Sequence, residues 1–340
     1  AVLIPEDIVG PFWPVAVKAA HANGVPAIVF PYTLADRKEA LQSLRQDPLF
    51  QTASNVIGAE LFPAWRWKGD DFDLVRLPED QIFAHQRLGI APPDPWMMNS
   101  GFADVICVDS EATFDFFRDG GIAPERMRVV GSASQDEMFR RLRERDAHRA
   151  GLERTYALSS TKPLLLVSGC PNQLGANAPS CVFSTMEELA DAVGRTLAPL
   201  TQHFNLLVRP HPNYPGFGEL LKRHGFVVAR DNTAHLIPLA DVFVAFASAT
   251  IRWAIACGVP TVNYDVFNYG YTEFSEVAGI DTVNTLQAFE SSCAQLALPA
   301  RVTELHDRIR KASPRWAVMD GDSLSRIQIE IEKASRACAK

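Results

Sequence analysis

The chain has 340 residues, of which 47% are aliphatic, aromatic or cysteine and 21% are charged, with 33 lysines and arginines against 40 acids and a formal net charge of -7. This length exceeds what one hydrophobic core usually serves, and the composition excludes an intrinsically disordered chain. The acidic balance and the lack of a basic stripe with interleaved aromatics argue against nucleic-acid binding. We therefore expect a soluble globular protein of about two domains.

No apolar run reaches the roughly 18 to 20 residues needed to cross a bilayer, and no charged-then-apolar leader opens the chain, so we expect a cytoplasmic protein. Its six cysteines form no CxxC pair, and we expect buried free thiols rather than a metal site or disulfides. They are Cys107, Cys170, Cys181, Cys257, Cys293 and Cys338.

The first residues, 1 to 7, read as a strand that ends in the acids Glu6 and Asp7. A domain that opens on a core strand suggests that an upstream part of it is missing. A helix over 14–23 begins near a proline, ends before Gly24 and leads into a strand over 25–30. Strand, helix and strand at this spacing predict a βαβ unit of a parallel sheet.

A polar helix is expected over 35–46, and the pattern then weakens from Pro48 to Pro95, where Trp65 and Trp67 stand among prolines. A long irregular segment of this kind predicts a binding loop. Order returns with a strand over 103–110, a capped helix over 111–118 and a strand over 127–130.

Alternating charges over 136–160 predict a solvated helix that leads into a linker near 159–162. The expected domains are therefore 1–160 on the acceptor side and 161–320 for nucleotide binding, with a terminal helix over 321–340 that packs back toward the first domain. The second domain is expected to open with a strand over 163–169 and to continue with a helix over 184–200.

Two later apolar strands end abruptly in polar or small residues. The strand over 206–209 ends in Arg209 and is followed by His211, which stands between Pro210 and Pro212. Prolines on both sides restrict the backbone to extended shapes and so direct the imidazole. Such strand ends face the ligand crevice of an open parallel sheet, where Arg209 and His211 could both reach a phosphate. The alternative is a histidine that only caps the strand.

The next strand, over 242–247, runs into Ser248, Ala249 and Thr250 and then into a helix over 251–257. Hydroxyl residues at a strand-to-helix junction can form an anion site for a nucleotide phosphate, although an ordinary serine N-cap is the alternative. Ser168 and Gly169 end another strand of this domain and are further candidates for the same pocket.

A His-Pro pair after a strand, followed by a Ser/Thr pair that starts a helix, resembles the nucleotide-binding half of GT-B transferases that use cytidine-activated donors. These include bacterial sialyltransferases, Kdo transferases of capsule assembly and CDP-glycerol glycerophosphotransferases. The resemblance implies an α/β fold of two Rossmann-like domains with parallel sheets that face a cleft. It also implies that His211, Ser248 and Thr250 hold the donor phosphate and cytidine.

Two departures favour a sugar donor over glycerol phosphate. The second motif reads Phe246-Ala247-Ser248-Ala249-Thr250, without the acid and paired serines of many teichoic-acid enzymes. In addition, Phe30-Pro31-Tyr32-Thr33 stands where those enzymes tend to have a His-Gly pair.

A base for the acceptor should be a carboxylate at a strand end of the first domain, and Asp7 is the first candidate with Glu6 the second. A helix cap or a solvated turn is the alternative for both, and Asp109 and Asp136 are further candidates. Residues that follow the strand over 259–265 are expected to contact the ribose or the sugar. They are Asp265, Tyr269, Glu273 and Glu276, although Glu273 and Glu276 could also be surface acids. No DxD-like pair and no metal-ligand spacing occur, so we expect no metal and no cofactor besides the nucleotide-sugar donor.

The sequence thus predicts a glycosyltransferase that moves a sugar from a cytidine-activated donor, of the CMP-ulosonic acid type, to a surface-polysaccharide acceptor. Its expected partners are the donor, the glycan acceptor and the glycan assembly machinery at the inner face of the membrane, with no nucleic acid. Two alternatives stay open. One is a UDP-N-acetylglucosamine 2-epimerase-like isomerase, and the other is a catalytically degenerate GT-B protein kept for assembly or binding.

Overall fold

The structure is a computed structural model, and it describes residues 1–10, 12–31, 41–42, 44–45, 47–69, 73–97, 99–175, 178 and 180–337. The chain divides into two compact units. Unit 1 comprises Ala1–Ala133 and Asp322–Lys340, and unit 2 comprises Ser134–Gly321. The predicted helix over 35–46 and the residues Tyr32, Thr33 and Cys338 lie wholly or largely outside the described residues.

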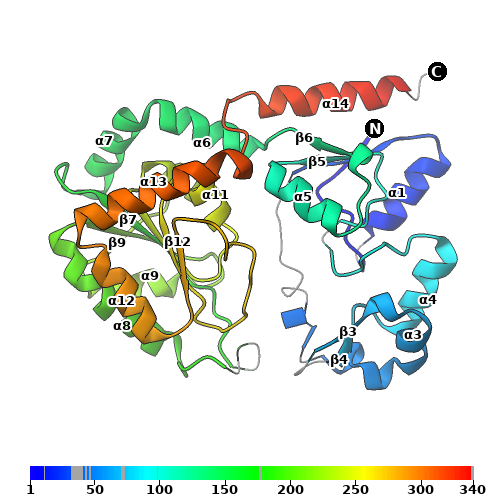
Figure 1. The fold of residues 1–340 in the computed structure, drawn as a ribbon, viewed down its shortest axis with the longest axis horizontal. Helices are drawn as coiled ribbons and strands as arrows, with labels where there is room; N and C mark the ends of the chain where they lie inside the picture. Colours follow the sequence, from blue (N-terminus) through cyan, green and yellow to red (C-terminus); the bar gives the residue numbers. More distant parts are fainter. Residues whose placement is uncertain are drawn as a thin grey trace. The chain divides into compact units, whose positions relative to one another are not determined.

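Unit 1 is built on a parallel sheet of strand order β1-β2-β5-β6, of which Figure 1 labels β5 and β6. Its strands are β1 (Val2–Ile4), β2 (Ala27–Val29), β5 (Val105–Val108) and β6 (Met127–Val129), and its helices around the sheet are α1 (Trp13–Ala22), α5 (Glu111–Asp119), the 3-10 turn η4 (Pro124–Arg126) and α14 (Ser323–Ala337). The βαβ unit predicted from the first 30 residues is present. Strand β1 precedes α1 in the chain and β2 follows it, and the two strands pair in parallel.

The segment between Pro48 and Pro95 is not the irregular loop that the sequence suggested. Over its described residues it folds into η1 (Pro48–Phe50), η2 (Thr52–Ser54), α3 (Val56–Leu61), η3 (Pro63–Trp65), an antiparallel pair β3 (Arg66–Lys68) and β4 (Asp73–Val75), and α4 (Glu79–Leu88). Trp65, Val75 and Ile82 form its small core. Most of these elements span only three to six residues, too few for a hydrophobic period to show in the sequence.

Helix α14 belongs to unit 1, although it follows unit 2 in the chain. Its buried residue Ile327 packs with Ile28, Cys107 and Val130 on one face of the sheet. On the other face, side chains of α1 and α5 pack against the strands. The Arg326 Nε donates to the Val130 carbonyl at 2.9 Å, which ties the helix to the end of β6.

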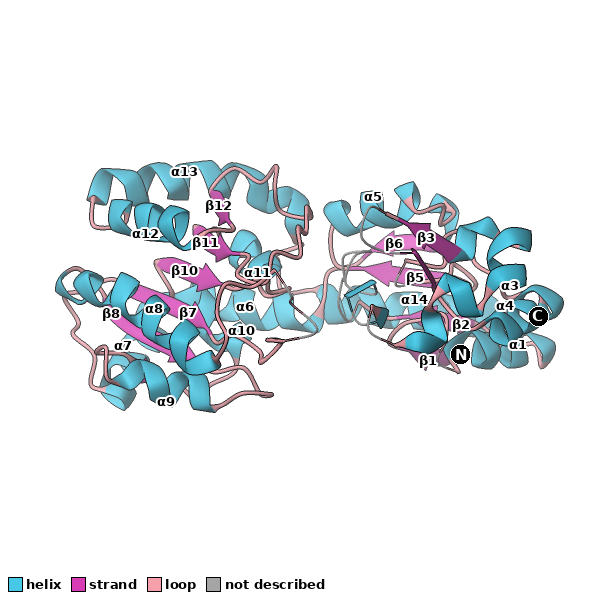
Figure 2. Cartoon of the chain, turned by 90° about the horizontal axis from the view of Figure 1, so that it is seen from below, coloured by secondary structure: helices cyan, strands magenta, loops and turns pink. Residues whose placement is uncertain are grey.

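Unit 2 holds a six-stranded sheet of order β12-β11-β10-β7-β8-β9, parallel throughout (Figure 2). Its strands are β7 (Leu164–Ser168), β8 (Asn205–Arg209), β9 (Val227–Val228), β10 (Val242–Ala245), β11 (Thr261–Tyr264) and β12 (Ile280–Val283). Its helices are α6 (Ala133–Arg143), α7 (Arg145–Tyr156), α8 (Met186–Leu197) with η5 (Ala198–Gln202), α9 (Gly216–Lys222), α10 (Thr233–Leu236) with η6 (Ile237–Leu239), α11 (Ile251–Ala256), α12 (Leu286–Gln295) and α13 (Pro299–Trp316).

Both faces of the unit 2 sheet are buried. In β7, Leu165 faces the core that includes α8, α9 and α12, whereas Leu166 faces the core that includes α7, α11 and α13. Strands covered on both sides need apolar residues at every position, which is why β7, β8 and β10 read as continuous apolar runs rather than alternating ones.

Helices α6 and α7 pack with unit 2, so the division between units falls at Ala133 and Ser134, whereas the charge pattern suggested a linker near 159–162. Two arginines of α7, Arg145 and Arg149, are partly or largely withdrawn from solvent, whereas Arg154 is exposed. Arg145 and Arg149 contact the two carboxylate oxygens of Asp241 at 2.8 and 3.2 Å, just before β10. The Asp241 carboxylate also accepts the Leu164 N–H at 2.7 Å, so this one acid joins α7 to the start of β7.

Five cysteines fall in the described part of the chain, and all five are free thiols; Cys107, Cys170 and Cys293 are buried. Burial raises the pKa of the Cys107 thiol to about 12, which makes it unreactive at neutral pH. Of the helices that the structure describes, none has both the length and the apolar character that a bilayer crossing requires.

Candidate functional site

The order of strands in unit 2 defines where a ligand can enter. Strand β7 lies between β8 and β10, and the chain passes to β8 on one side and returns to β10 on the other. Connections that leave in opposite directions open a crevice at the carboxyl ends of the strands, where ligands of open α/β sheets bind. Val167 of β7 is level with Val208 of β8 and Val244 of β10. The turns after β8 and β10, which carry His211 and Ser248, therefore leave the same edge of the sheet about 10 Å apart.

The turns after β7 and β8 are in direct contact. The Gly169 N–H donates to the Arg209 carbonyl at 2.7 Å. A Cβ at Gly169 would lie 2.5 Å from the His211 nitrogen and 2.6 Å from the Pro210 Cα, closer than any side chain tolerates. Glycine is thus required next to Ser168, and its small size sets how closely His211 approaches β7.

His211 is half-buried, and its Nδ1 accepts the Asn213 N–H at 3.1 Å. With Nδ1 as the acceptor, the neutral ring carries its proton on Nε2 and presents a donor on that side. Burial and the nearby Arg209 charge lower the pKa of His211, so the ring is neutral at pH 7. Pro212 lacks an N–H and leaves the Asn213 amide to make this bond.

Arg209 stabilises the turn that carries His211 through hydrogen bonds to backbone carbonyls. Its Nε donates to the Asp231 carbonyl and its Nη1 to the Pro210 carbonyl, both at 2.7 Å. Two of its donor nitrogens are therefore occupied by backbone, so the charge acts on His211 from a fixed position.

The hydroxyl residues after β10 form a compact turn. Ser248 Oγ lies 2.8 Å from Thr250 Oγ1 and accepts the Thr250 N–H at 3.3 Å. Ala247 enters the turn in the left-handed region, with φ +47°, and its N–H donates to Asn263 Oδ1 at 2.9 Å. The cap residue of α11 is Thr250, whose side chain makes no cap bond, so Ser248 is not the ordinary N-cap of this helix. Exposed Ala249 adds no polar group to the site.

Asp265 and Tyr269 organise the loop after β11. The buried Asp265 carboxylate accepts the N–H groups of Tyr269 and Gly270 at 3.0 and 2.7 Å. The Tyr269 hydroxyl donates to Gln173 Oε1 at 2.6 Å, and Gln173 lies in the loop after β7. Asp265, which was expected to contact the sugar or ribose, therefore stabilises the loop after β11 through backbone hydrogen bonds. Tyr269 connects this loop to the loop after β7.

Glu273 pairs with Arg252 of α11, with 3.5 Å between Arg252 Nε and Glu273 Oε1. Only 7% of the Arg252 side chain and 11% of the Glu273 side chain are exposed. Glu273 therefore fixes the loop after β11 to α11, where the sequence suggested a ribose or sugar contact. Arg252 was missed because a cation within a short apolar helix carries no motif.

The two acids proposed as base differ in exposure. Asp7 is fully buried, and its carboxylate accepts the N–H groups of Ser100 and Phe102 at 2.6 and 3.2 Å. Asp7 therefore holds the loop before β5, and burial raises its pKa. Glu6 is part-exposed, and burial raises its pKa too. Asp109 accepts the Thr113 hydroxyl at 2.6 Å, whereas the N-cap of α5 is its neighbour Ser110, whose hydroxyl oxygen accepts the Thr113 N–H.

Comparison with solved structures shows the same fold at low sequence identity. UDP-GlcNAc 2-epimerase from Neisseria meningitidis bound to UDP-GlcNAc superimposes with a TM-score of 0.57 at 14% identity, over 98% of this chain and 76% of that chain. A variant of the wall teichoic acid polymerase TagF gives 0.56 at 11% identity, over 93% and 70%. The S. aureus MnaA structure with UDP gives 0.54 at 15% identity, over 97% and 74%. This chain spans 59% and 66% of the length of two further TagF structures.

No protein-family model and no curated protein sequence matches the chain. The fold class is nevertheless clear, since the two α/β units with parallel sheets are Rossmann-like units of the GT-B type. The predicted fold class is thereby confirmed.

Proposed function

We propose that the chain is a GT-B enzyme that acts on a nucleotide-activated sugar, and that it transfers the sugar from a cytidine-activated donor to a glycan acceptor. The observation that carries the proposal is that the turns of Gly169, His211 and Ser248 leave the same carboxyl edge of the unit 2 sheet, with the Gly169 and His211 turns in direct contact. A donor Nε2–H, two hydroxyls and a closely approaching backbone are groups suited to a phosphate.

In such a transfer the donor phosphate becomes the leaving group and gains negative charge as the bond to the sugar breaks. A fixed imidazole N–H and the hydroxyls of Ser248 and Thr250 would stabilise that charge without reorganisation. These groups suffice without a metal ion, so metal independence is part of the proposal.

An epimerase-like reaction is the second candidate, because two of the similar structures carry UDP-GlcNAc or UDP. Such a reaction would need several acids that converge on the sugar. In unit 2, Asp265 accepts two backbone amides and Glu273 pairs with Arg252, so both are engaged within the protein. This use of the acids favours transfer over epimerisation.

Isothermal titration of CMP beside UDP tests the nucleotide. We expect CMP to bind more tightly, and His211→Ala and Ser248→Ala each to weaken binding about tenfold. His203→Ala is the matched control, because exposed His203 stands just before β8 and His211 just after it. Preference for UDP would favour the epimerase, and unchanged binding in both variants would remove the site assignment altogether.

The acceptor base is proposed at Glu6, because Asp7 is enclosed by backbone donors. Glu6→Gln is expected to lower turnover strongly while leaving the unfolding transition in place. Asp7→Asn is expected to lower stability, since an amide offers one acceptor oxygen where two N–H groups need one each. Two measurements on each variant separate a catalytic from a structural role. Turnover of a CMP-linked sugar is measured through the release of CMP, and stability is measured by thermal unfolding. Full turnover in Glu6→Gln would refute the role of Glu6 as the base. A wild-type protein that binds CMP but shows no turnover would also refute it, and would favour the catalytically degenerate alternative.

The surface-polysaccharide acceptor, an ulosonic acid as the sugar and an association with glycan assembly at the inner membrane face are also proposed. These proposals rest on the resemblance of the His211 and Ser248 motifs to those of the GT-B transferases that use cytidine-activated donors.

A further inference from the structure

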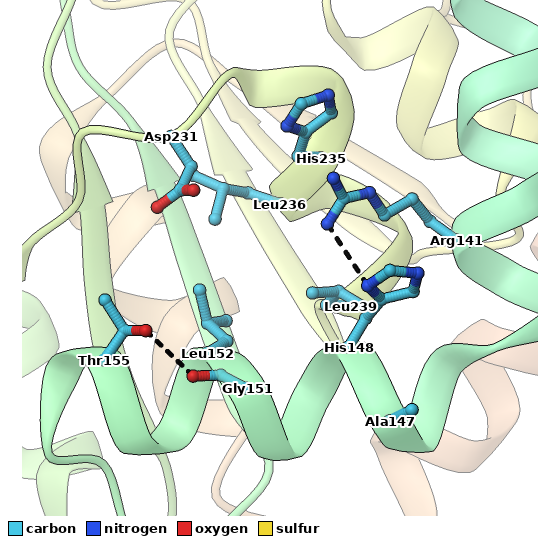
Figure 3. A pocket seen from close by; sticks show the side chains of 10 residues that line it. All are labelled: Arg141, Ala147, His148, Gly151, Leu152, Thr155, Asp231, His235, Leu236 and Leu239. Carbon is cyan, nitrogen blue, oxygen red and sulfur yellow. Dashed lines mark hydrogen bonds between the residues drawn. The ribbon is translucent and has the colours of Figure 1, made fainter.

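Unit 2 contains a cavity of about 220 Å³ beside α7, which we name the α7 cavity (Figure 3). Its walls come from α6, α7, the turn after β9, α10 and η6. None of the strand-end residues assigned to the nucleotide lines it, so it is a separate feature of the unit.

One side of the α7 cavity carries nitrogen donors, and the one arginine among them is paired with the Glu137 carboxylate. Arg141, His148 and His235 gather there (Figure 3). Arg141 Nε donates to Glu137 Oε1 at 3.0 Å and Arg141 Nη1 lies 3.4 Å from His148 Nδ1, while His235 Nε2 lies 3.5 Å from the same Glu137 oxygen. Among the described residues, no hydrogen bond engages the Arg141 Nη2, so this nitrogen can donate to an anion in the cavity.

The other side is suited to hydroxyl groups. Asp231 and Thr155 lie there, across the cavity from Arg141 (Figure 3). Asp231 Oδ2 already accepts one hydroxyl, that of Tyr156, at 2.6 Å. Leu152 and Leu236 are buried beneath the polar groups and can pack against C–H surfaces. An anion-binding end, a hydroxyl-binding end and an apolar floor are the groups that a phosphorylated sugar requires.

A second, independent observation is the glycine in the middle of α7. Gly151 lines the cavity, and a Cβ built on it would meet no atom within 4 Å. Glycine weakens a helix interior relative to alanine, and neither packing nor backbone conformation requires it here. The missing side chain leaves room on the cavity side of the helix.

The size of the cavity limits the ligand. Pockets for drug-sized ligands have volumes of about 300–1,000 Å³, and the α7 cavity is smaller. We propose that it binds a monosaccharide phosphate, with the phosphate at Arg141 and His235 and the sugar hydroxyls at Asp231 and Thr155. Arg209, which bonds to the Asp231 carbonyl, connects this site to the turn of His211.

Titration calorimetry on the full chain with glucose 6-phosphate, inorganic phosphate and glucose as separate probes tests the proposal. We expect glucose 6-phosphate to bind more tightly than either fragment, and Arg141→Gln and Gly151→Leu each to weaken it at least tenfold. Arg140→Gln is the matched control, because Arg140 pairs with Glu137 at 2.6 Å but does not line the cavity.

Two results with the cavity variants or the wild type would overturn the site, and a third would come from His211→Ala. One is no binding of glucose 6-phosphate at millimolar concentration, and the other is an equal loss in Arg140→Gln, which would reduce the effect to the Glu137 ion pairs. His211→Ala should leave glucose 6-phosphate binding intact. Binding abolished by His211→Ala but untouched by Gly151→Leu would assign the probe to the nucleotide site instead. A melt of each variant shows that the fold is retained.

Discussion

His211 is the residue whose environment most clearly departs from that of a surface histidine. Because burial and the Arg209 charge lower its pKa, the unfolded chain binds more protons as the pH falls through the ordinary histidine range near 6.5. Folded stability is therefore lost as the pH falls through that range, and is fully present above it.

Replacing His211 by asparagine should remove this part of the pH dependence. Urea unfolding of the wild type and of His211→Asn between pH 5.5 and 8 measures it. We expect the wild type to lose stability relative to the variant on acidification. A difference that does not change with pH would mean that the imidazole titrates as it does in water.

Gly169 and Gly151 differ in the space that is available for an added side chain. Gly169→Ala would force a Cβ against the Pro210 and His211 backbone, and we expect a loss of about 1–3 kcal/mol together with weaker nucleotide binding. Gly151→Ala meets open space and should stabilise the protein by about 0.5–1 kcal/mol. Denaturant midpoints of the two variants check both signs, and a neutral Gly169→Ala would show that the two turns can move apart.

Among the elements, α7 depends on one carboxylate for its docking. Asp241→Asn keeps the shape but removes the charge that Arg145 and Arg149 share, and Arg149 is only 11% exposed. We expect a loss of about 1–3 kcal/mol, because charged hydrogen bonds are lost and a nearly buried guanidinium keeps its charge. Urea unfolding measures it, with Glu144→Gln as the control, since the Glu144 side chain is 74% exposed and its contact with His148 contributes little.

The elements also show what the sequence could and could not reveal. The strands β7, β8 and β10 were predictable because burial on both faces requires continuous apolar runs. The same charge pattern that suggested a solvated 136–160 segment instead supplies the arginines that bind Asp241, since sequence spacing does not show a partner about 90 residues away. The acids Asp7, Asp265 and Glu273 were placed at strand ends or loops correctly, but their partners are backbone amides or Arg252, which no motif announces.

At the scale of the whole molecule, the chain returns from unit 2 to complete unit 1. Helix α14 covers Ile28, Cys107 and Val130, so unit 1 cannot bury this face of its sheet without the last residues of the chain. Ile327 and Ile331 both lie against that cluster, whereas Leu324, which the sequence suggested for the same apolar face, is 54% exposed. We therefore expect the stability of the unit 1 sheet to depend on α14.

Ile327→Ala tests that dependence. Ile327 is 8% exposed, and its truncation should cost about 2–4 kcal/mol through lost burial and a residual cavity. Ile329 on the same helix is 47% exposed, so Ile329→Ala should cost far less and serves as the control. Hydrogen exchange followed by mass spectrometry locates the effect, with faster exchange expected in β2 and β5 but not in β7 and β10. Equal acceleration in all four strands would mean that the two units unfold as one, and no change in any of them would mean that α14 adds nothing to the stability of the sheet.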